Sequence, residues 1–321
     1  SKPLRYGTPP CGQVDIVPAE APFETLNEYG CLAMLGWNTM TPDLSARLTA
    51  YVEQGGTLFL SVPHLSTRTR TDQPQRFING GDVRDLCGVR LLGPGPVVDE
   101  VLLARQTEDR RYALARGTLY LEAVPLAGLE LHGARVLAHP RETPDQPVLL
   151  EHRVGRGTVY LLAAWDYPGD RLEAFITDIL RALADGQQGD IAVESRDVFY
   201  AVYDGMFPSG QCYAIVYLVN HDVYGQPAYP HLVVRGCRVP VRVTPRQLRI
   251  VWVMDDLVLA PHDRFVKLTD ARREADGWRV DLEAVPPHRG AAEDAERLLQ
   301  VERLGGQVGA VWLGGGERER E

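Results

Sequence analysis

The sequence has no run of 18 or more apolar residues, which argues against a membrane-spanning helix and against a membrane partner. It also has almost no lysine: Lys2 and Lys267 are the only two, and the formal net charge is −9. A nucleic-acid-binding surface needs a basic face, so this charge argues against a nucleic-acid partner. No stretch with a charged start and an apolar centre opens the sequence, and we therefore expect a cytoplasmic protein.

Cysteine pairs and metal-binding patterns are missing as well. None of the five cysteines stands in a Cys-x-x-Cys pair, which argues against a zinc site and against a disulfide framework. The histidines are not spaced as metal ligands, and no glycine-rich loop stands between a strand and a helix to hold phosphate. We therefore expect no metal and no cofactor. The cysteines are Cys11, Cys31, Cys87, Cys212 and Cys237.

A recognisable catalytic motif is also absent. Ser61 lies in the segment LFLSVPH, without the glycines of the Gly-x-Ser-x-Gly turn that exposes a serine nucleophile. No cysteine stands in a comparable turn. Asp255 and Asp256 fall in a predicted turn, whereas a retaining glycosidase holds two carboxyl groups about 5 Å apart on a scaffold. We therefore predict that this chain holds no catalytic residue.

What the sequence does contain is a β-α-β pattern near its start. Residues 31–37 (CLAMLGW) are continuously apolar, as in a strand that is buried on both faces. Thr41 is a candidate N-cap of a helix, and Pro42 suits its first position. Gly55 and Gly56 end the helix, and residues 57–62 form the next apolar strand. The apolar stripe of the helix consists of Leu44, Leu48, Tyr51 and Val52.

Strand and helix signals continue to alternate after this unit. Residues 14–18 (VDIVP) are predicted to be a strand that precedes it, and residues 97–150 are predicted to be short strands with turns. Two further strands are joined through Gly155–Gly157, and Asp170 is expected to cap a final helix. The apolar stripe of that helix consists of Leu172, Phe175, Ile176, Ile179, Leu180 and Leu183.

The pattern changes after residue 187. Residues 188–290 contain strand-sized segments of alternating or β-branched residues, separated by turn residues at roughly 8 to 12 positions, which is typical of an antiparallel sandwich. Residues 291–321 are predicted to be a short helix, one last strand and a disordered tail. The sequence thus predicts an α/β domain over residues 1–187 and a β-sandwich over residues 188–290.

Six side chains are expected to meet at one edge of the α/β sheet, because ligands of open α/β sheets bind at the carboxyl ends of the parallel strands. Aromatic rings beside an amide, a carboxylate and an imidazole could stack on a sugar and bond to its hydroxyl groups. The same side chains could instead contact a partner domain or subunit, or pack only against one another. These candidate binding or interface residues are Trp37, Asn38, His64, Trp165, Asp166 and Tyr167.

Three segments resemble a known family. They are VDIVPAEAP…YGCLAMLGWNTMTPDLSARLTAYVEQGGTLFLSV, INGGDVRDLCGVRLLG and GRGTVYLLAAWDYPGDRLEAFITDILRAL. Together they resemble the amidotransferase-like domain that follows the catalytic barrel in β-galactosidases with a trimerisation domain. The resemblance implies an α/β flavodoxin-like (class I amidotransferase-like) domain, followed by an all-β, Ig-like sandwich.

The sequence departs from this family in two ways. The catalytic acid and nucleophile of the family lie in the barrel, which is not present in this sequence, so no catalytic residue can be assigned from the resemblance. The family domain also begins with a strand and a helix before the segment that starts here at Val14, and residues 1–13 are too few to form them. The first β-α unit is therefore expected to be missing.

The resemblance favours one of three hypotheses. In the first, the chain is a non-catalytic accessory and oligomerisation region of a β-galactosidase-like protein, with a catalytic barrel domain or subunit and further copies of itself as partners. In the second, it is a free-standing amidotransferase-like hydrolase that uses His64 with Ser61 or Cys31. In the third, it is a carbohydrate-binding protein that uses the sandwich or the aromatic edge. A fold does not fix a function, so all three remain open at this point.

Overall fold

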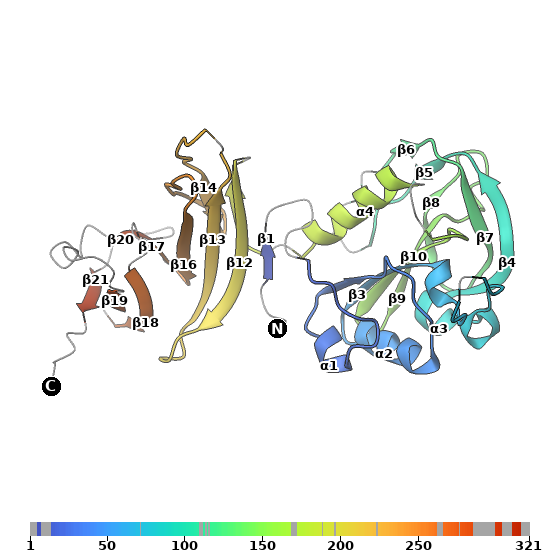
Figure 1. The fold of residues 1–321 in the computed structure, drawn as a ribbon, viewed down its shortest axis with the longest axis horizontal. Helices are drawn as coiled ribbons and strands as arrows, with labels where there is room; N and C mark the ends of the chain where they lie inside the picture. The colour runs from blue at the N-terminus through green and yellow to red at the C-terminus, as the bar shows by residue number, and fades with distance from the viewer. Residues whose placement is uncertain are drawn as a thin grey trace. The chain divides into compact units, whose positions relative to one another are not determined.

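The computed structural model describes residues 5–7, 14–70, 72–108, 112, 114, 116–167, 172–187, 189–195, 197–222, 224–261, 266–275, 277–284, 299–303 and 310–315. These residues divide into two compact units (Figure 1). The first unit, called here the α/β unit, contains residues 14–187. The second, called here the all-β unit, contains the N-terminal strand and the residues after 187.

The α/β unit is built around a seven-stranded sheet with the strand order β2-β3-β10-β9-β8-β5-β6. Its helices and turns are α1 (Phe23–Leu26), α2 (Pro42–Glu53), η1 (Val62–Leu65), η2 (Ile78–Gly81), α3 (Arg84–Cys87) and α4 (Glu173–Asp185). Its strands are β2 (Cys31–Ala33), β3 (Thr57–Ser61), β4 (Val89–Val98), β5 (Val101–Leu103), β6 (Leu119–Tyr120), β7 (Val124–Leu131), β8 (Arg135–His139), β9 (Leu149–Val154) and β10 (Gly157–Leu162). Strands β4 and β7 form a separate two-stranded ribbon.

The seven-stranded sheet is mixed. Strands β2, β3 and β10 are parallel, and every other pair in the sheet is antiparallel. The structure therefore confirms an α/β domain, but it does not confirm the flavodoxin-like arrangement that the resemblance implied. The physical reason is that residues 97–150 form short strands joined by short turns. A short turn can join only antiparallel neighbours, because parallel neighbours need a long crossover connection.

The predicted β-α-β unit forms, but its first strand differs from the prediction. Strand β2 spans only Cys31–Ala33 instead of residues 31–37, and it is not buried on both faces because it stands at the end of the sheet. The Thr41 hydroxyl accepts a hydrogen bond from the Leu44 N–H at 3.1 Å, which caps α2. The residues of the predicted stripe are the buried residues of this helix, and all five residues of β3 are buried. Helices α2 and α3 lie on one face of the sheet and α4 on the other (Figure 1).

Two sequence predictions concern the first residues of the α/β unit and the start of its last helix. Residues 14–18 were predicted to be a strand, but no strand forms there, and the side chains of Val14 and Ile16 are exposed. A β-branched segment becomes a strand only when it finds a partner strand, and none of the described strands pairs with it. Helix α4 begins after Leu172, which has a left-handed backbone with a φ of 62°, and Asp170 lies outside the described residues.

The all-β unit is a six-stranded sheet with a smaller sheet on each face. The order of the large sheet is β1-β12-β13-β16-β17-β20, and the small sheets are β11-β14-β15 and β18-β19-β21. Its strands are β1 (Arg5–Gly7), β11 (Ile191–Glu194), β12 (Val198–Met206), β13 (Cys212–Asn220), β14 (His231–Val234), β15 (Cys237–Pro240), β16 (Leu248–Met254), β17 (Leu257–Pro261), β18 (Val266–Glu274), β19 (Gly277–Ala284), β20 (Leu299–Arg303) and β21 (Ala310–Gly315). Alternation along β16 places Val251 and Val253 in one core and Trp252 and Met254 in the other.

The ends of the sequence contribute to the all-β unit as well. Strand β1 pairs antiparallel with β12, so these N-terminal residues do not belong to the α/β unit. The short helix predicted over residues 291–302 lies largely outside the described residues, and its end forms strand β20, which pairs with β17. No helix within the described residues is both long and apolar enough to cross a membrane.

Candidate functional site

The carboxyl ends of β2, β3 and β10 meet at one edge of the sheet, as parallel pairing requires. The register aligns Ala33 with Phe59 and Ser61 with Leu162. The six predicted residues follow these strands directly, and the structure brings three of them into mutual contact. We call the contact set of Asn38, His64 and Tyr167 the edge cluster.

Hydrogen bonds and ring contacts hold the edge cluster together. The Asn38 Nδ2 donates to the His64 carbonyl at 2.9 Å. The rings of His64 and Tyr167 meet edge to face, with their centroids 5.2 Å apart, and the Tyr167 hydroxyl donates to the Pro63 carbonyl at 3.3 Å. Burial raises the pKa of Tyr167, so its hydroxyl keeps its proton. The cluster therefore ties together the segments that leave three parallel strands.

Ser61 and His64 form the most enclosed part of this edge. The Ser61 N–H donates to the His64 Nδ1 at 3.0 Å, and the Ser61 hydroxyl lies 2.8 Å from the same nitrogen. An Nδ1 that accepts from an N–H carries no proton, so the neutral ring carries its proton on Nε2. Burial lowers the pKa of His64 to about 4, although hydrogen bonds to the backbone of Ser61 and Gly36 partly oppose the shift. His64 is neutral at physiological pH.

The other predicted residues lie outside this contact set. The Trp165 ring meets Phe77 edge to face at 5.6 Å, and the Gln75 amide donates to the Trp165 carbonyl at 3.2 Å. Trp165 is therefore half-buried by the segment that follows η1. In contrast, 44% of the Trp37 surface is exposed, and Asp166 is exposed as well. Trp37 and Asp166 are thus the two predicted residues that are exposed.

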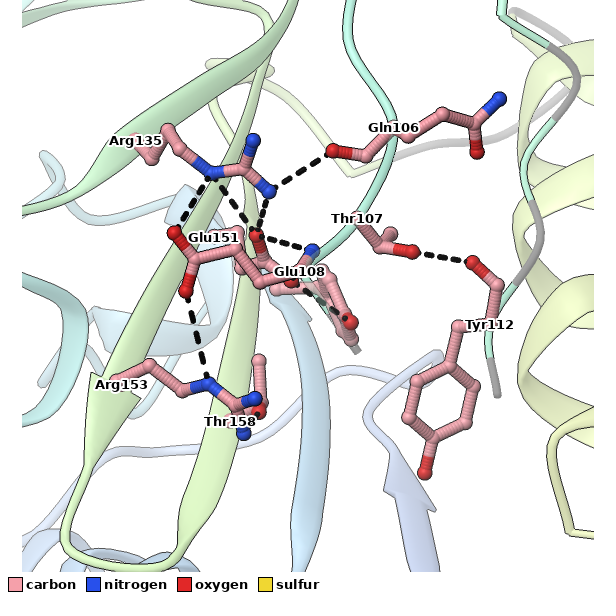
Figure 2. A network of polar contacts seen from close by, with 9 residues as sticks. Gln106, Thr107, Glu108, Tyr112, Arg135, Glu151, Arg153 and Thr158 are labelled. Atoms are coloured by element: carbon pink, nitrogen blue, oxygen red, sulfur yellow. Dashed lines mark hydrogen bonds and ion pairs between the residues drawn. The ribbon is translucent and has the colours of Figure 1, made fainter. Parts of the chain in front are cut away.

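A second polar network, which the sequence analysis missed, lies on β8, β9 and β10 (Figure 2). The Glu151 carboxylate is buried and accepts hydrogen bonds from the Arg135 Nε at 3.2 Å, from the Glu108 N–H at 3.1 Å and from the Tyr160 hydroxyl at 3.2 Å. The register places Arg135, Glu151 and Tyr160 side by side on neighbouring strands. This network fastens residues 106–108 to the sheet.

The all-β unit has a hollow of about 310 Å³, lined by residues of the six-stranded sheet and of the β11-β14-β15 sheet. Asp190, Asp204, Arg235 and Asp255 are among the residues that line it. None of the predicted site residues lines it. Within the described residues, no group of three or more histidine, cysteine or acidic side chains is arranged to hold a metal ion.

A comparison with protein families decides the family of this chain. The model of the β-galactosidase trimerisation domain matches residues 12–185. The chain belongs to this family. None of the curated proteins compared with the chain matches it.

The fold of this trimerisation-domain chain is similar to parts of solved β-galactosidases. It matches the cold-adapted β-galactosidase from Rahnella sp. R3 with a TM-score of 0.50 and 17% identity, over 77% of this chain and 35% of that chain. It matches the β-galactosidase from Bacillus circulans sp. alkalophilus with a TM-score of 0.47 and 17% identity, over 76% of this chain and 35% of that chain. The chain thus spans about a third of their length, and the first similarity supports the fold alone.

The geometry of the trimerisation-domain unit gives Ser61 and His64 a structural role. Their 2.8 Å contact has the length expected of a nucleophile and its base, but both residues are fully buried, so a substrate has no access to the serine oxygen. The bond from the Ser61 N–H occupies the His64 nitrogen that would act as the base. The pair instead fixes the first turn of η1 at the end of β3.

Proposed function

We propose that this chain is a non-catalytic accessory region of a β-galactosidase-like protein, where it promotes homo-oligomerisation beside a catalytic barrel domain or subunit. The match of residues 12–185 to the β-galactosidase trimerisation domain carries this proposal. The enclosed Ser61–His64 contact supports a structural role rather than hydrolysis. We also propose that the parallel strands β2, β3 and β10 are the amidotransferase-like part of the unit, which their shared register supports.

The first test is the mass of the chain in solution. Light scattering over a hundredfold range of protein concentration should give a mass three times that of the single chain at the upper end. Most homo-oligomers have closed symmetry, which for three identical subunits is a three-membered ring. A mass equal to one chain at every concentration would contradict the oligomerisation role.

The edge that carries Trp37 is the proposed contact with the catalytic partner or with the sugar that the partner binds. Trp37 is partly exposed, and aromatic rings at the surface are enriched at recognition surfaces. In the complex with the catalytic barrel, Trp37→Ala should raise the KM for a β-galactoside or weaken the complex. Leu121→Ala, at another exposed apolar position of the same unit, is the matched control. If the KM and the stability of the complex are the same for both variants and for the unchanged protein, Trp37 does not have this role.

The cytoplasmic location predicted from the sequence stays a prediction.

A further inference from the structure

Strands β14 and β15 form a hairpin whose pairing continues past the ends of both strands. Residues 235–236 join the strands, and their φ values of 48° and 82° are both positive, as a type I′ hairpin turn requires. Beyond the strands, Ala228 and Val243 exchange two backbone hydrogen bonds of 3.0 and 2.9 Å in the same register. This register places Tyr229 directly opposite Arg242.

The two faces of this hairpin differ in character. Side chains alternate between the faces of a sheet, and one set of this hairpin is buried in the core shared with the six-stranded sheet. The opposite face, called here the hairpin face, consists of Tyr229, His231, Arg238 and Arg242. On this face 65% of the Tyr229 surface is exposed, and both arginines are exposed as well. The buried set is Leu232, Val234, Val239, Val241 and Val243.

The hairpin face lies in a segment from which acidic residues are missing. Residues 223–254 contain five arginines and no aspartate, glutamate or lysine, whereas the chain as a whole has a net charge of −9. Arg238 forms an ion pair with Glu194 of β11. Arg242 forms no ion pair with any residue that the structure describes, so its charge is available to a partner. The hairpin face is thus a local concentration of positive charge on a negatively charged molecule.

Protection of a sheet edge explains only part of this face. Strand β15 is an edge strand of the sheet β11-β14-β15, and charged residues and prolines keep such edges unpaired. Arg238, Pro240 and Arg242 fit that role. Tyr229 does not, because an exposed aromatic ring favours association instead of preventing it. Tyrosine and arginine together are typical of the residues that dominate binding at interfaces, so the combination indicates a binding surface.

The spacing of the two arginines favours an extended ligand. Arg238 and Arg242 are four residues apart along one extended segment, which separates their Cα atoms by about 13 Å. A chain with repeated negative charges pairs with both guanidinium groups at this spacing, without either side chain having to bend toward the other. Guanidinium groups bind carboxylates through two parallel hydrogen bonds. The Tyr229 ring beside Arg242 offers an apolar surface on which a sugar ring stacks.

We propose that the hairpin face binds a polysaccharide that carries carboxylates on its sugar rings. Arg242 pairs with one carboxylate, Tyr229 stacks on the adjoining sugar ring, and Arg238 exchanges its partner Glu194 for a second carboxylate. The choice of a saccharide over an acidic peptide rests on the proposed function beside a β-galactosidase-like barrel. The hairpin face belongs to the all-β unit, so this site is distinct from the edge cluster of the α/β unit.

The test is calorimetric titration of the whole chain with polygalacturonate at low ionic strength. Binding is expected, and it should weaken as salt is added, because salt screens exposed charges. An uncharged galactan and poly-L-glutamate are titrated in the same way, and each should bind at least tenfold more weakly. A chain that does not bind polygalacturonate would overturn the proposal. Equal binding of the galactan would overturn the role of the arginines, and equal binding of poly-L-glutamate would overturn the choice of a saccharide.

Variants locate the binding on the hairpin face. Arg242→Glu and Tyr229→Ala should each weaken the binding of polygalacturonate at least tenfold. Arg272→Glu makes the same change of charge at an exposed position of β18, and Phe199→Ala removes an exposed ring from β12. Neither control should change the affinity. If Arg272→Glu weakens binding as much as Arg242→Glu does, the affinity reflects only the net charge of the chain, and the proposed site is wrong.

The mass in solution separates this inference from the proposed function. If the chain is oligomeric but does not bind polygalacturonate, the hairpin face does not have this role and the proposed function stands. If the chain binds polygalacturonate through Arg242 and Tyr229 but has the mass of one chain at every concentration, the oligomerisation role fails and the binding site stands.

Discussion

His64 is a buried side chain, and its protonation makes the stability of the protein depend on pH. Its pKa falls from 6.5 to about 4 in the folded protein, so the unfolded chain takes up a proton first as the pH falls. Stability is therefore complete above pH 6.5 and decreases from there toward pH 4. One pKa unit corresponds to about 1.4 kcal/mol, so the loss attributable to His64 at pH 5 is about 2 kcal/mol. Urea unfolding at pH 7.5 and pH 5 measures this loss.

The matched variant for this prediction is His64→Asn, whose side-chain oxygen can accept the Ser61 N–H without titrating. Its free energy of unfolding should fall less between pH 7.5 and pH 5 than that of the unchanged protein. The comparison is needed because burial also lowers the pKa of His152, which both proteins share. The same pH dependence in both proteins would show that His64 takes up its proton in the folded state as easily as in the unfolded chain.

Arg135 partly neutralises the buried Glu151 carboxylate, and its loss should be costly. Arg135→Ala leaves a carboxylate that is almost fully inaccessible without its guanidinium, and breaking a buried pair in this way typically costs 3–5 kcal/mol. We expect a loss of about 3 kcal/mol in the free energy of unfolding. Arg153→Ala is the control, because Arg153 is more exposed and lies 3.9 Å from Glu108, so its loss should cost less than about 1 kcal/mol. Similar losses in the free energy of unfolding for both variants would show that Arg135 does not stabilise the buried Glu151 carboxylate more than an exposed ion pair would.

The two networks differ in how far the sequence could predict them. The approach of Asn38, His64 and Tyr167 was predictable, because each follows a strand of a parallel set whose carboxyl ends share one edge. The hydrogen bonds among these residues could not be predicted from the sequence. The contact with Phe77 that partly buries Trp165 could not be predicted either. The contact of Arg135 with Glu151 depends on the antiparallel register of β8 and β9, which the sequence pattern does not fix.

At the scale of elements, the packing of α2 against β10 depends on a glycine. A Cβ atom at Gly157 would lie 2.1 Å from the Val52 carbonyl oxygen and 2.3 Å from the Gly56 carbonyl oxygen. Both are backbone atoms, which cannot rotate away. Gly157→Ala should therefore lower the free energy of unfolding by at least about 1–3 kcal/mol, as overpacked cores do. Gly128→Ala is the control, because its Cβ would meet its nearest atom at an ordinary 3.6 Å. Equal urea midpoints for the two variants would contradict the close packing of α2 on β10.

The elements themselves were predictable where local signals and burial agree. Helix α2 has its cap, its proline and its apolar stripe in the sequence, and the structure has all three. Residues 14–18 have a strand-like composition but no described partner strand, and composition alone does not make a strand. The mixed sheet was missed for a related reason. A short strand between turns is compatible with either sheet type, and only the connections distinguish them.

At the scale of the whole molecule, the division into two units does not follow the sequence in order. The sequence analysis placed residues 1–187 in one domain, because the N-terminal residues precede the α/β pattern directly. Strand β1 instead pairs with β12 of the all-β unit. Such a long-range pairing leaves no local signal, because a strand of three residues has too few positions to show a periodicity.

This pairing predicts that a change in β1 affects β12, which lies almost 200 residues later in the sequence. Gly7 lies so close to β12 that a Cβ there would stand 2.3 Å from the Tyr200 carbonyl oxygen and 3.1 Å from the Ala201 Cα. Gly7→Ala should push β1 away and expose backbone groups of β12. Hydrogen exchange should then become at least tenfold faster at amides of β12, while β3 in the α/β unit keeps its protection. Gly36→Ala is the control, because no atom lies within 4 Å of its added Cβ. Faster exchange in β3 with unchanged exchange in β12 would instead assign the N-terminal strand to the α/β unit.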